Sequence, residues 1–339
     1  MTGFSVEPGY LDTASVGAPP DSAAAALRDA IGEWQRGRAR PQDYDRLVTA
    51  AREAFARLVN VPAAQVCVGS QVSVMVGLVA ASLPAGARVV CLEGDFTSLL
   101  FPFLAQSARG VETVLVAPDR LVESIGPGTS LVAVSAVQSA TGAIADLDAI
   151  CAAAARHGAR TLVDITQACG WLPIDAARFD ITVCSGYKWL LCPRGTAFMT
   201  VRGPMLDEIL PAAAGWYAGE DIWDSIYGAP LRLATTARRL DVSPAWLCWV
   251  GAVPALEVIE SVGVAAIHDH DLSLANRVRD RLGLPPGRSA IVRIESPAAA
   301  DRLAAGGIRA SMRSGAVRLS FHLYNTVDDA EGVADALRS

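Results

Sequence analysis

Two spacings of apolar residues alternate along the first two hundred residues of the chain. Residues 21–60 carry apolar side chains three or four positions apart, which predicts amphipathic helices. From residue 65 onward, short apolar runs alternate with further helical segments, expected at 72–83, 99–107 and 147–157. The short runs predict seven strands, at 65–70, 87–94, 111–117, 130–138, 159–166, 180–186 and 196–201. Such runs, apolar on both faces and separated by helices, predict a three-layer α/β domain with a mostly parallel seven-stranded sheet.

The pattern changes after about residue 205. Residues 211–243 are irregular and rich in aromatic side chains, and the following helices are expected at 245–262, 264–282 and 328–337. Alternating strands at 290–295 and 316–322 complete a smaller α+β C-terminal domain. We therefore expect an N-terminal segment (1–20) that contributes to the small domain or the active site, a large domain (21–240) and a small domain (241–339).

Composition narrows the class of protein. Hydrophobic residues make up 52% and charged residues 19% of the chain, which indicates a sizeable buried core. The net charge of −6 and the lack of a basic run argue against a nucleic-acid partner. No signal peptide pattern and no membrane-spanning apolar run is visible, so no membrane association is expected.

The cysteine and histidine content gives two further expectations. The seven cysteines include no CxxC pair and are expected to be reduced thiols of a cytoplasmic protein. Histidine, cysteine and aspartate do not cluster at the spacings typical of metal ligands, so no metal site is predicted.

Small and polar residues follow several of the predicted strands. In an open parallel sheet, ligands bind at the carboxyl ends of the strands. The residues at these ends are Gly69, Ser70, Gln71, Gly94, Asp95, Phe96, Gln138, Ser139, Asp164, Ile165, Thr166, Gln167, Ser185, Gly186, Tyr187 and Lys188. A hydrophobic core does not require these residue types, so we expect a ligand site at this edge of the sheet.

Lys188 is the one lysine in a chain that has 29 lysines and arginines together. Codon usage in a GC-rich genome explains why lysine is scarce, but not why one lysine is retained at a strand end. Arginine stays charged and cannot form an imine, whereas a partly desolvated lysine can. Lys188 therefore points to imine chemistry, although composition alone leaves chance retention at an interior position equally open.

Asp164 favours the imine hypothesis. It lies 24 positions before Lys188, at the end of an apolar strand, and a buried carboxylate needs a positive partner. The pyridinium nitrogen of pyridoxal phosphate would be such a partner, while a salt bridge to arginine or a helix N-cap are the alternatives. Gln167 could reach the phenolic oxygen of the same cofactor, or could be a solvated loop residue.

The strand–glycine–helix junction at 69–73 could hold a phosphate, because amide groups at a helix N-terminus bind anions. Ser185 and Tyr187 add hydroxyl donors close to Lys188, and Ser139 is a further candidate for cofactor contact at a strand end. The chain has neither GxGxxG in its first βα unit nor GxxxxGK[ST], which argues against nicotinamide cofactors and nucleoside triphosphates.

These motifs resemble the class V aminotransferase group of fold-type I pyridoxal-phosphate enzymes. The group includes cysteine desulfurases, kynureninases, isopenicillin N epimerase-like proteins and cysteine-conjugate lyases. The most specific matches are LVDITQACGWLPID (162–175) and SGYKWLLCPRGTAF (185–198), and the resemblance extends from residues 10–20 to 318–337. It implies a homodimer with the active site near the interface.

The resemblance also implies a role for each candidate residue. Lys188 matches the imine-forming lysine, Asp164 the partner of the pyridine nitrogen, and Gln167 the residue near the phenolic oxygen. Arg318 matches the arginine that clamps a substrate carboxylate, unless it is a strand residue paired on the surface. The remaining implied contacts are with the ring (Phe96) and with the phosphate (Gln71, Val72, Ser73, Ser185, Tyr187 and, from the partner subunit, Ser243). Many members have histidine in place of Tyr187.

The sequence therefore predicts a pyridoxal-phosphate enzyme that acts on a small amino-acid-like substrate. A C–S (cysteine-conjugate) β-lyase is the favoured activity, since residues 215–228 resemble lyase-like members, and an aminotransferase or epimerase is the alternative. Family desulfurases carry a catalytic cysteine in a C-terminal loop, but no cysteine follows Cys248 here, so persulfide-forming desulfurase activity is disfavoured. A non-catalytic binder would be expected to lack Lys188 or Asp164, and both are present.

Overall fold

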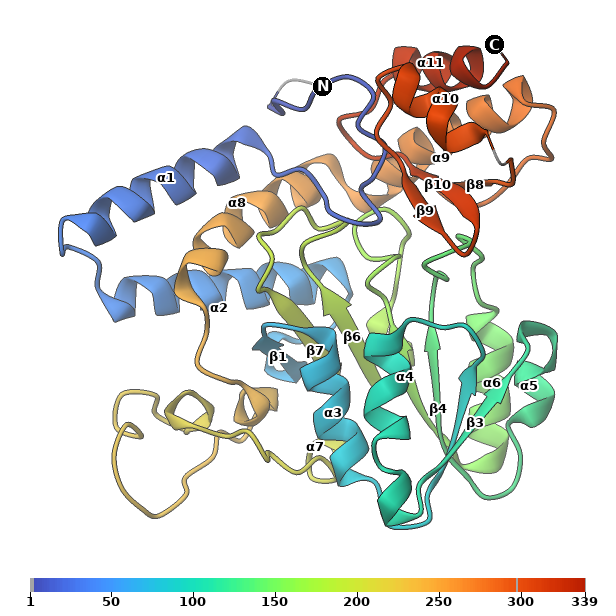
Figure 1. Ribbon diagram of the computed structural model, residues 1–339. Coiled ribbons are helices and arrows are strands. Elements are labelled where there is room, and N and C mark those ends of the chain that lie inside the picture. Colours follow the sequence, from blue (N-terminus) through green and yellow to red (C-terminus); the bar gives the residue numbers. More distant parts are fainter. Residues whose placement is uncertain (1–2, 297, 339) are drawn as a thin grey trace.

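A seven-stranded sheet forms the centre of the larger part of the molecule, with the strand order β1-β7-β6-β5-β4-β2-β3 (Figure 1). Its strands are β1 (Val66–Gly69), β2 (Arg88–Leu92), β3 (Glu112–Val116), β4 (Thr129–Ser135), β5 (Arg160–Asp164), β6 (Ile181–Ser185) and β7 (Ala197–Val201). The strand pairs from β3 to β6 are parallel, and only β7 runs antiparallel to its neighbours β1 and β6. The predicted α/β fold with a mostly parallel seven-stranded sheet is confirmed.

This computed structural model describes residues 3–296 and 298–338. The predicted N-terminal segment and small domain also include residues 1, 2, 297 and 339, which lie outside the described residues.

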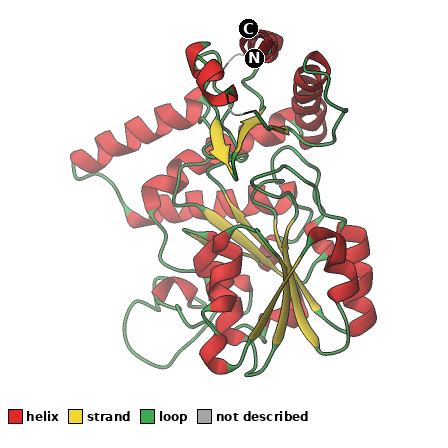
Figure 2. Ribbon diagram, turned by 45° about the vertical axis from the view of Figure 1, so that its right-hand side comes forward, coloured by secondary structure: helices red, strands yellow, loops and turns green. Residues whose placement is uncertain are grey.

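Helices cover both faces of the large sheet (Figure 2). On one face, α3 (Val72–Ser82) and α4 (Thr97–Leu104) pack on strand residues such as Cys91. On the other face, α5 (Leu121–Ser124) and α6 (Leu147–His157) pack on its neighbours Val90 and Leu92. Successive side chains of a strand point to opposite faces, so a strand buried on both sides must be apolar at every position. The continuous apolar runs of the sequence follow from this arrangement.

Three long helices pack together beside the β1–β7 end of the sheet: α1 (Asp21–Gln35), α2 (Pro41–Leu58) and α8 (Trp246–Val262). Phe55 of α2 stacks on Phe198 of β7, and Trp249 of α8 meets the same ring edge-on. Helix α8 follows the predicted domain boundary at residue 240, yet it packs against α1 and α2. The boundary stays a prediction.

A second, three-stranded antiparallel sheet has the order β8-β10-β9 and consists of β8 (Ile291–Ile294), β9 (Ser311–Arg313) and β10 (Ala316–Ser320). It lies with α9 (Val264–Arg281), α10 (Ala299–Ala305) and α11 (Val327–Arg338). The sequence analysis missed the short strand β9. Ser314 and Gly315 join β9 to β10 with φ values of 47° and 75°, as a two-residue hairpin requires.

Short helical turns complete the fold: α7 (Gly203–Leu206), η1 (Ala63–Gln65), η2 (Ser107–Arg109), η3 (Pro118–Arg120), η4 (Ala176–Arg178), η5 (Trp216–Ala218) and η6 (Ala237–Leu240). Among the described residues, no single helix is long and apolar enough to cross a membrane. Helices α8 and α9 reach that length and composition only as a pair, which is bent by 81°.

The N-terminal segment links the two sheets. Tyr10 pairs with Arg309, and Asp12 pairs with Ser320 at the end of β10. A few residues later, the amide of Gly17 donates to the carbonyl oxygen of Tyr187, at a distance of 2.9 Å. The segment therefore runs from the small sheet to the loop that follows β6.

Candidate active site

A cavity of about 300 Å³ lies at the carboxyl ends of the central strands. The residues that line it are Ser70, Gln71, Val72, Ser73, Phe96, Ser98, Ser135, Ser139, Asp164, Thr166, Gln167, Ser185, Tyr187, Lys188, Arg194 and Gly195. The structure thus brings together every residue predicted to contact a cofactor, with the exception of Ser243. Their convergence follows from the topology, because the ends of parallel strands meet at one edge of a sheet.

Lys188 follows β6 and is 4% exposed. Its Nζ atom lies 5.1 Å from the ring centroid of Phe96 and 5.8 Å from that of Tyr187. Burial lowers the pKa of Lys188 to about 8, against the opposing effect of the Asp164 carboxylate. Roughly a tenth of this amine is therefore unprotonated at pH 7, far more than for an ordinary lysine, and the unprotonated form is the one that reacts with a carbonyl group.

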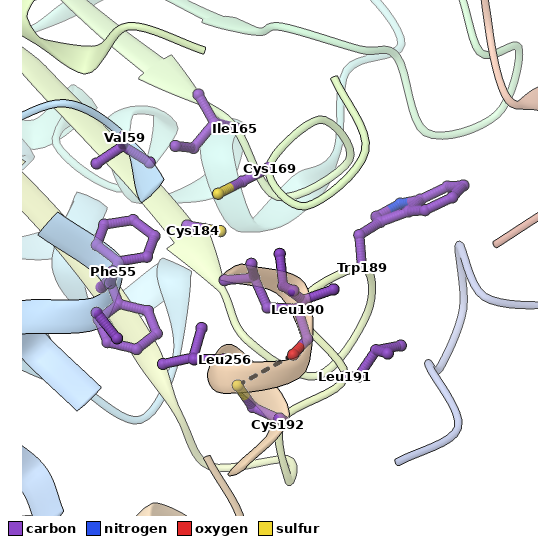
Figure 3. Packing of buried hydrophobic residues seen from close by; sticks show 14 of the residues in the cluster. Phe55, Val59, Ile165, Cys169, Cys184, Trp189, Leu190, Leu191, Cys192 and Leu256 are labelled. Atoms are coloured by element: carbon purple, nitrogen blue, oxygen red, sulfur yellow. Dashed lines mark hydrogen bonds between the residues drawn. The ribbon is translucent and has the colours of Figure 1, made fainter. Parts of the chain in front are cut away.

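The backbone around Lys188 is held from two sides. The amide of Gly186 donates to the carbonyl of Thr196 at 2.9 Å, so the loop closes on itself after the lysine. On the outer side, a Cβ atom added to Gly17 would lie 1.9 Å from the carbonyl oxygen of Lys188. The residues after Lys188 are fully buried (Trp189, Leu190 and Leu191), and Figure 3 shows their side chains among the residues of the apolar cluster. These contacts leave the lysine backbone little freedom.

Asp164, at the end of β5, accepts a hydrogen bond from the amide of Thr166 at 2.8 Å. Burial raises the pKa of Asp164 to about 6, while the hydrogen bonds from Thr166 and the charge of Lys188 oppose that rise. In the described part of the chain, no arginine forms an ion pair with this carboxylate. The Thr166 contact closes a turn, and no helix begins there, since the next helical element is η4 at Ala176. Neither the helix N-cap nor the arginine salt bridge is therefore observed among the described residues.

Gln167 is fixed by three hydrogen bonds. Its Nε2 atom donates to the carbonyl of Ala14 and to Oγ of Ser139, both at 3.0 Å. Its Oε1 atom accepts from the indole Nε1 of Trp189 at 2.7 Å. Gln167 is therefore an ordered cavity residue and not a solvated loop residue. Its contact with a phenolic oxygen stays a prediction.

The N-terminus of α3 forms one wall of the cavity. The first helical hydrogen bond runs from Met75 to Gln71, so the amides of residues 72–74 precede the hydrogen-bonded turns and have no acceptor within the helix. Ser70, Ser73 and Ser185 line the same cavity. Amides at a helix N-terminus together with hydroxyl groups form a favourable site for an anion.

Arg318, on β10, is 1% exposed and lies directly behind Ser139. Its Nη1 atom donates to the carbonyl oxygen and to Oγ of Ser139, at 2.7 and 3.1 Å, and its Nη2 atom donates to Oγ of Ser15 at 2.6 Å. Burial lowers its pKa to about 10. Because Arg318 is buried, it is not an arginine paired on the surface. Ser139 lines the cavity and accepts hydrogen bonds from Arg318, so it links this arginine to the cavity.

Ser243 is exposed and does not line the cavity of its own chain. Its predicted contact was with a partner subunit, and that contact stays a prediction. For metals, the described residues contain no group of three or more histidine, cysteine, aspartate or glutamate side chains that could hold an ion.

Four cavity residues were not expected at the site, namely Ser98, Ser135, Arg194 and Gly195, while Ser70 and Thr166 were expected at this edge of the sheet without an assigned contact. Ser70 and Thr166 stand at strand ends, so their position was a usable signal. Ser135 is the last residue of β4, but the strand was predicted to extend to residue 138, so this strand end was not recognised. The carboxylate of Asp95 accepts from the Ser135 amide at 2.9 Å and from its hydroxyl at 2.6 Å. Arg194 does not stand at a strand end. It lies in the loop between β6 and β7, and the fold of this loop brings it to the cavity.

Comparisons with known proteins identify the class of this fold and site. Among solved structures, the complex of the cystine C-S lyase C-DES with its product cysteine persulfide superposes with a TM-score of 0.87 at 22% identity, covering 98% of this chain and 97% of that one. A C-DES mutant with glycine covalently linked to pyridoxal phosphate gives a TM-score of 0.88 at 20% identity, covering 98% and 96%. The fold is that of the fold-type I pyridoxal-phosphate enzymes.

Comparisons of the sequence with known proteins agree with this assignment of the fold. The family described as "Aminotransferase class-V" matches residues 21–302. The chain is 28% identical to the uncharacterized aminotransferase YcbU of Bacillus subtilis, over 85% of this chain and 82% of that protein. It is 26% identical to isopenicillin N epimerase of Streptomyces clavuligerus, over 96% and 93%. The chain belongs to the class V aminotransferase family and is a pyridoxal-phosphate-dependent enzyme.

The residues of the cavity fit this cofactor. A buried amine of lowered pKa suits its aldehyde, and a buried carboxylate without an arginine partner suits its ring nitrogen. The free amides of α3 and the nearby serine hydroxyls suit its phosphate. The aldehyde, the ring nitrogen and the phosphate of pyridoxal phosphate thus each have a matching nucleophile, acceptor or set of donors in one cavity.

Proposed function

We propose that this enzyme is a C–S β-lyase that converts a cysteine conjugate and water into a thiol, pyruvate and ammonia. Lys188, which is the one lysine of the chain and stands in the cavity with Asp164, supports the chemistry that all of these family reactions share. The choice of a lyase rests on the resemblance of residues 215–228 to lyase-like members of the family. Bound pyridoxal phosphate supplies an aldehyde that condenses with amines and a ring that stabilises negative charge at the substrate Cα. The protein must then position groups and move protons.

Lys188 is suited to both of its proposed tasks. As a neutral amine it would hold the cofactor aldehyde, and as a free amine the same Nζ atom would remove the Cα proton of the substrate. A pKa of about 8 keeps it close to the working pH of a general base. Asp164, as a carboxylate, would favour the protonated form of the ring nitrogen and so the positive charge of the ring.

Arg318 is the proposed anchor for the substrate carboxylate. A guanidinium presents parallel donors that match a carboxylate in a bidentate pair. Its Nη2 atom donates to the hydroxyl of Ser15 at 2.6 Å and lies 3.7 Å from Oδ1 of Asp12, so a substrate carboxylate would compete with that longer ion pair and replace the neutral Ser15 acceptor. Ser139, bonded both to Arg318 and to Gln167, would couple this anchor to the cofactor site.

Persulfide-forming desulfurase activity is not supported by the cysteines of this chain. The last cysteine of the sequence is Cys248. It lies on α8, outside the cavity lining, and its thiol donates to the carbonyl of Arg194 at 3.1 Å. A lyase needs no such thiol, because the sulfur leaves with the product.

Amino transfer or epimerisation is the second candidate. The similarity to an aminotransferase and to isopenicillin N epimerases, at 26–28% identity over most of the chain, favours it. All of these reactions begin with removal of the Cα proton, and the cofactor-facing residues serve each of them equally well. The reactions differ in whether a group leaves from Cβ.

Product analysis separates the two candidates. The purified enzyme with pyridoxal phosphate is given a series of S-substituted cysteines, and thiol, pyruvate and ammonia are measured together. The lyase predicts their release in equal amounts without added keto acid. Efficient amino transfer to a keto acid without pyruvate release would reject the lyase proposal. In either case, borohydride treatment should attach the cofactor covalently to the peptide that contains Lys188.

A further inference from the structure

The loop that follows Lys188 folds back, so that Arg194 also lines the cavity. The amide of Cys192 donates to the carbonyl of Gly186 at 3.0 Å, and the hydroxyl of Thr196 donates to the carbonyl of Pro193 at 2.9 Å. Gly195 has a φ of +110°, which favours glycine, and an added Cβ there would lie 2.7 Å from Sγ of Cys248. The backbone on both sides of Arg194 is therefore fixed.

The side chain of Arg194 is placed against Tyr187. Its guanidinium carbon lies 4.8 Å from the ring centroid of Tyr187, and both residues line the cavity. Within residues 3–296 and 298–338, the guanidinium has no hydrogen-bond acceptor and no carboxylate partner. An exposed arginine held on an aromatic ring, with its donors free, is prepared to bind an anion.

The charges around the cavity point to the same conclusion. Of the described lining residues, Lys188 and Arg194 are the basic ones and Asp164 is the acidic one. Lys188 cannot serve as a permanent counter-ion, because its amine is needed in the neutral form. A phosphate ester carries close to two negative charges at neutral pH. The guanidinium of Arg194 is the remaining fixed positive charge that can balance it.

We propose that Arg194 binds the phosphate of pyridoxal phosphate, with the ring of Tyr187 as its platform. The contact complements the amides of α3 and the hydroxyls of Ser73 and Ser185, which supply hydrogen bonds but no full charge. The inference rests on the pyridoxal-phosphate dependence of the enzyme and does not depend on the reaction that the enzyme catalyses.

The test compares two ligands that differ only in the phosphate group. Dissociation constants of the apoenzyme for pyridoxal phosphate and for pyridoxal are measured by absorbance for the wild type, Arg194→Gln and Arg194→Lys. Arg309→Gln is the matched control, because Arg309 is exposed and its guanidinium carbon lies 5.4 Å from the ring centroid of Tyr10, away from the cavity.

We expect Arg194→Gln to weaken binding of pyridoxal phosphate by roughly 10- to 100-fold, the range for a lost hydrogen bond to a charged group. Binding of pyridoxal should change by less than about twofold, since no phosphate contact is lost. Arg194→Lys should restore part of the affinity, because it retains the charge without the planar fork. Arg309→Gln should leave both constants unchanged.

Two results would overturn the inference while the cofactor assignment stands. Equal weakening of both ligands by Arg194→Gln would mean that Arg194 only supports the loop, and unchanged binding of both would mean that it makes no contact with the phosphate. A wild-type protein that takes up neither ligand would overturn the cofactor assignment together with this inference.

Discussion

At the scale of single residues, Lys188 offers an unusually direct test of the proposed chemistry. Lys188→Arg retains a positive charge in a cavity of about 300 Å³, so the fold should persist. Turnover should fall by roughly 10³-fold or more, because arginine can neither form an imine nor act as a base at neutral pH. Steady-state kinetics and circular dichroism check both statements. More than a tenth of wild-type turnover in the variant would contradict the role of Lys188.

The pKa of Lys188 is measurable without interference from other lysines, because the chain has none. The rate at which an amine-specific reagent labels Lys188 in the apoenzyme, followed by mass spectrometry, should rise with pH and reach half its maximum near pH 8. Asp164→Asn should move that midpoint to lower pH, because the carboxylate raises the pKa of Lys188. A midpoint near 10.5, the ordinary lysine value, would show that burial has no effect.

The same shift affects stability. The pKa of Lys188 is lower in the folded than in the unfolded chain, so the unfolded chain binds more protons between about pH 8 and 10.5. The contribution of this group to the free energy of unfolding therefore increases with pH across that window. Its destabilising effect is complete below about pH 8, where both states are protonated. Urea denaturation of the wild type and Lys188→Ala across this range would measure the difference.

The site was predictable where strand geometry alone determines it. Asp164, Gln167, Ser185 and Lys188 follow strands, so the alternation of apolar runs and helices was sufficient to place them together. Arg194 was not predictable, because its position depends on a loop closed by backbone hydrogen bonds and on the φ of +110° at Gly195. The hydrogen bond from Trp189 to Gln167 was equally hidden, since it joins residues of two separate loops.

At the scale of elements, the strands and long helices of the large sheet followed from apolar spacing, because burial on both faces leaves a clear pattern. Strand β9 did not, because it has three residues, two of which are exposed. The path of the N-terminal segment was also not visible in the sequence. That segment is held by the pairings of Tyr10 with Arg309 and of Asp12 with Ser320, which join residues about three hundred positions apart.

Gly17 is the point at which this segment meets the lysine loop. Gly17→Ala would place a methyl group 1.9 Å from the carbonyl oxygen of Lys188 and 2.7 Å from Cδ2 of Leu191. We expect a loss of about 1–3 kcal/mol in the free energy of unfolding, typical of overpacking, and a fall in turnover as the lysine backbone shifts. Gly126→Ala is the matched control, because nothing lies within 4 Å of its added Cβ. Equal unfolding free energies and turnover for the two variants would contradict the proposed contact.

At the scale of the whole molecule, the segment that follows α7 exposes large apolar side chains. Tyr227 is 89% and Leu231 is 77% exposed. Figure 1 shows this segment as an extended loop at the lower edge of the molecule, away from the small sheet. Large exposed apolar groups of this kind mark surfaces of association, and the resemblance to class V enzymes implies a homodimer. We therefore expect this loop to contribute to a dimer contact.

Light scattering of the purified holoenzyme should give a mass of twice 35.4 kDa. The double variant Tyr227→Ser, Leu231→Ser should shift the mass towards a single chain, whereas Val122→Ser, which alters an exposed apolar residue on α5, should not.

The predicted role of Ser243 can be tested with the same variants. If Ser243 of one chain completes the phosphate site of its partner, the monomeric double variant should bind pyridoxal phosphate more weakly than the wild type. Ser243→Ala should weaken this binding without changing the mass. A wild-type protein that remains a single chain at tens of micromolar would reject the dimer and, with it, the role of Ser243.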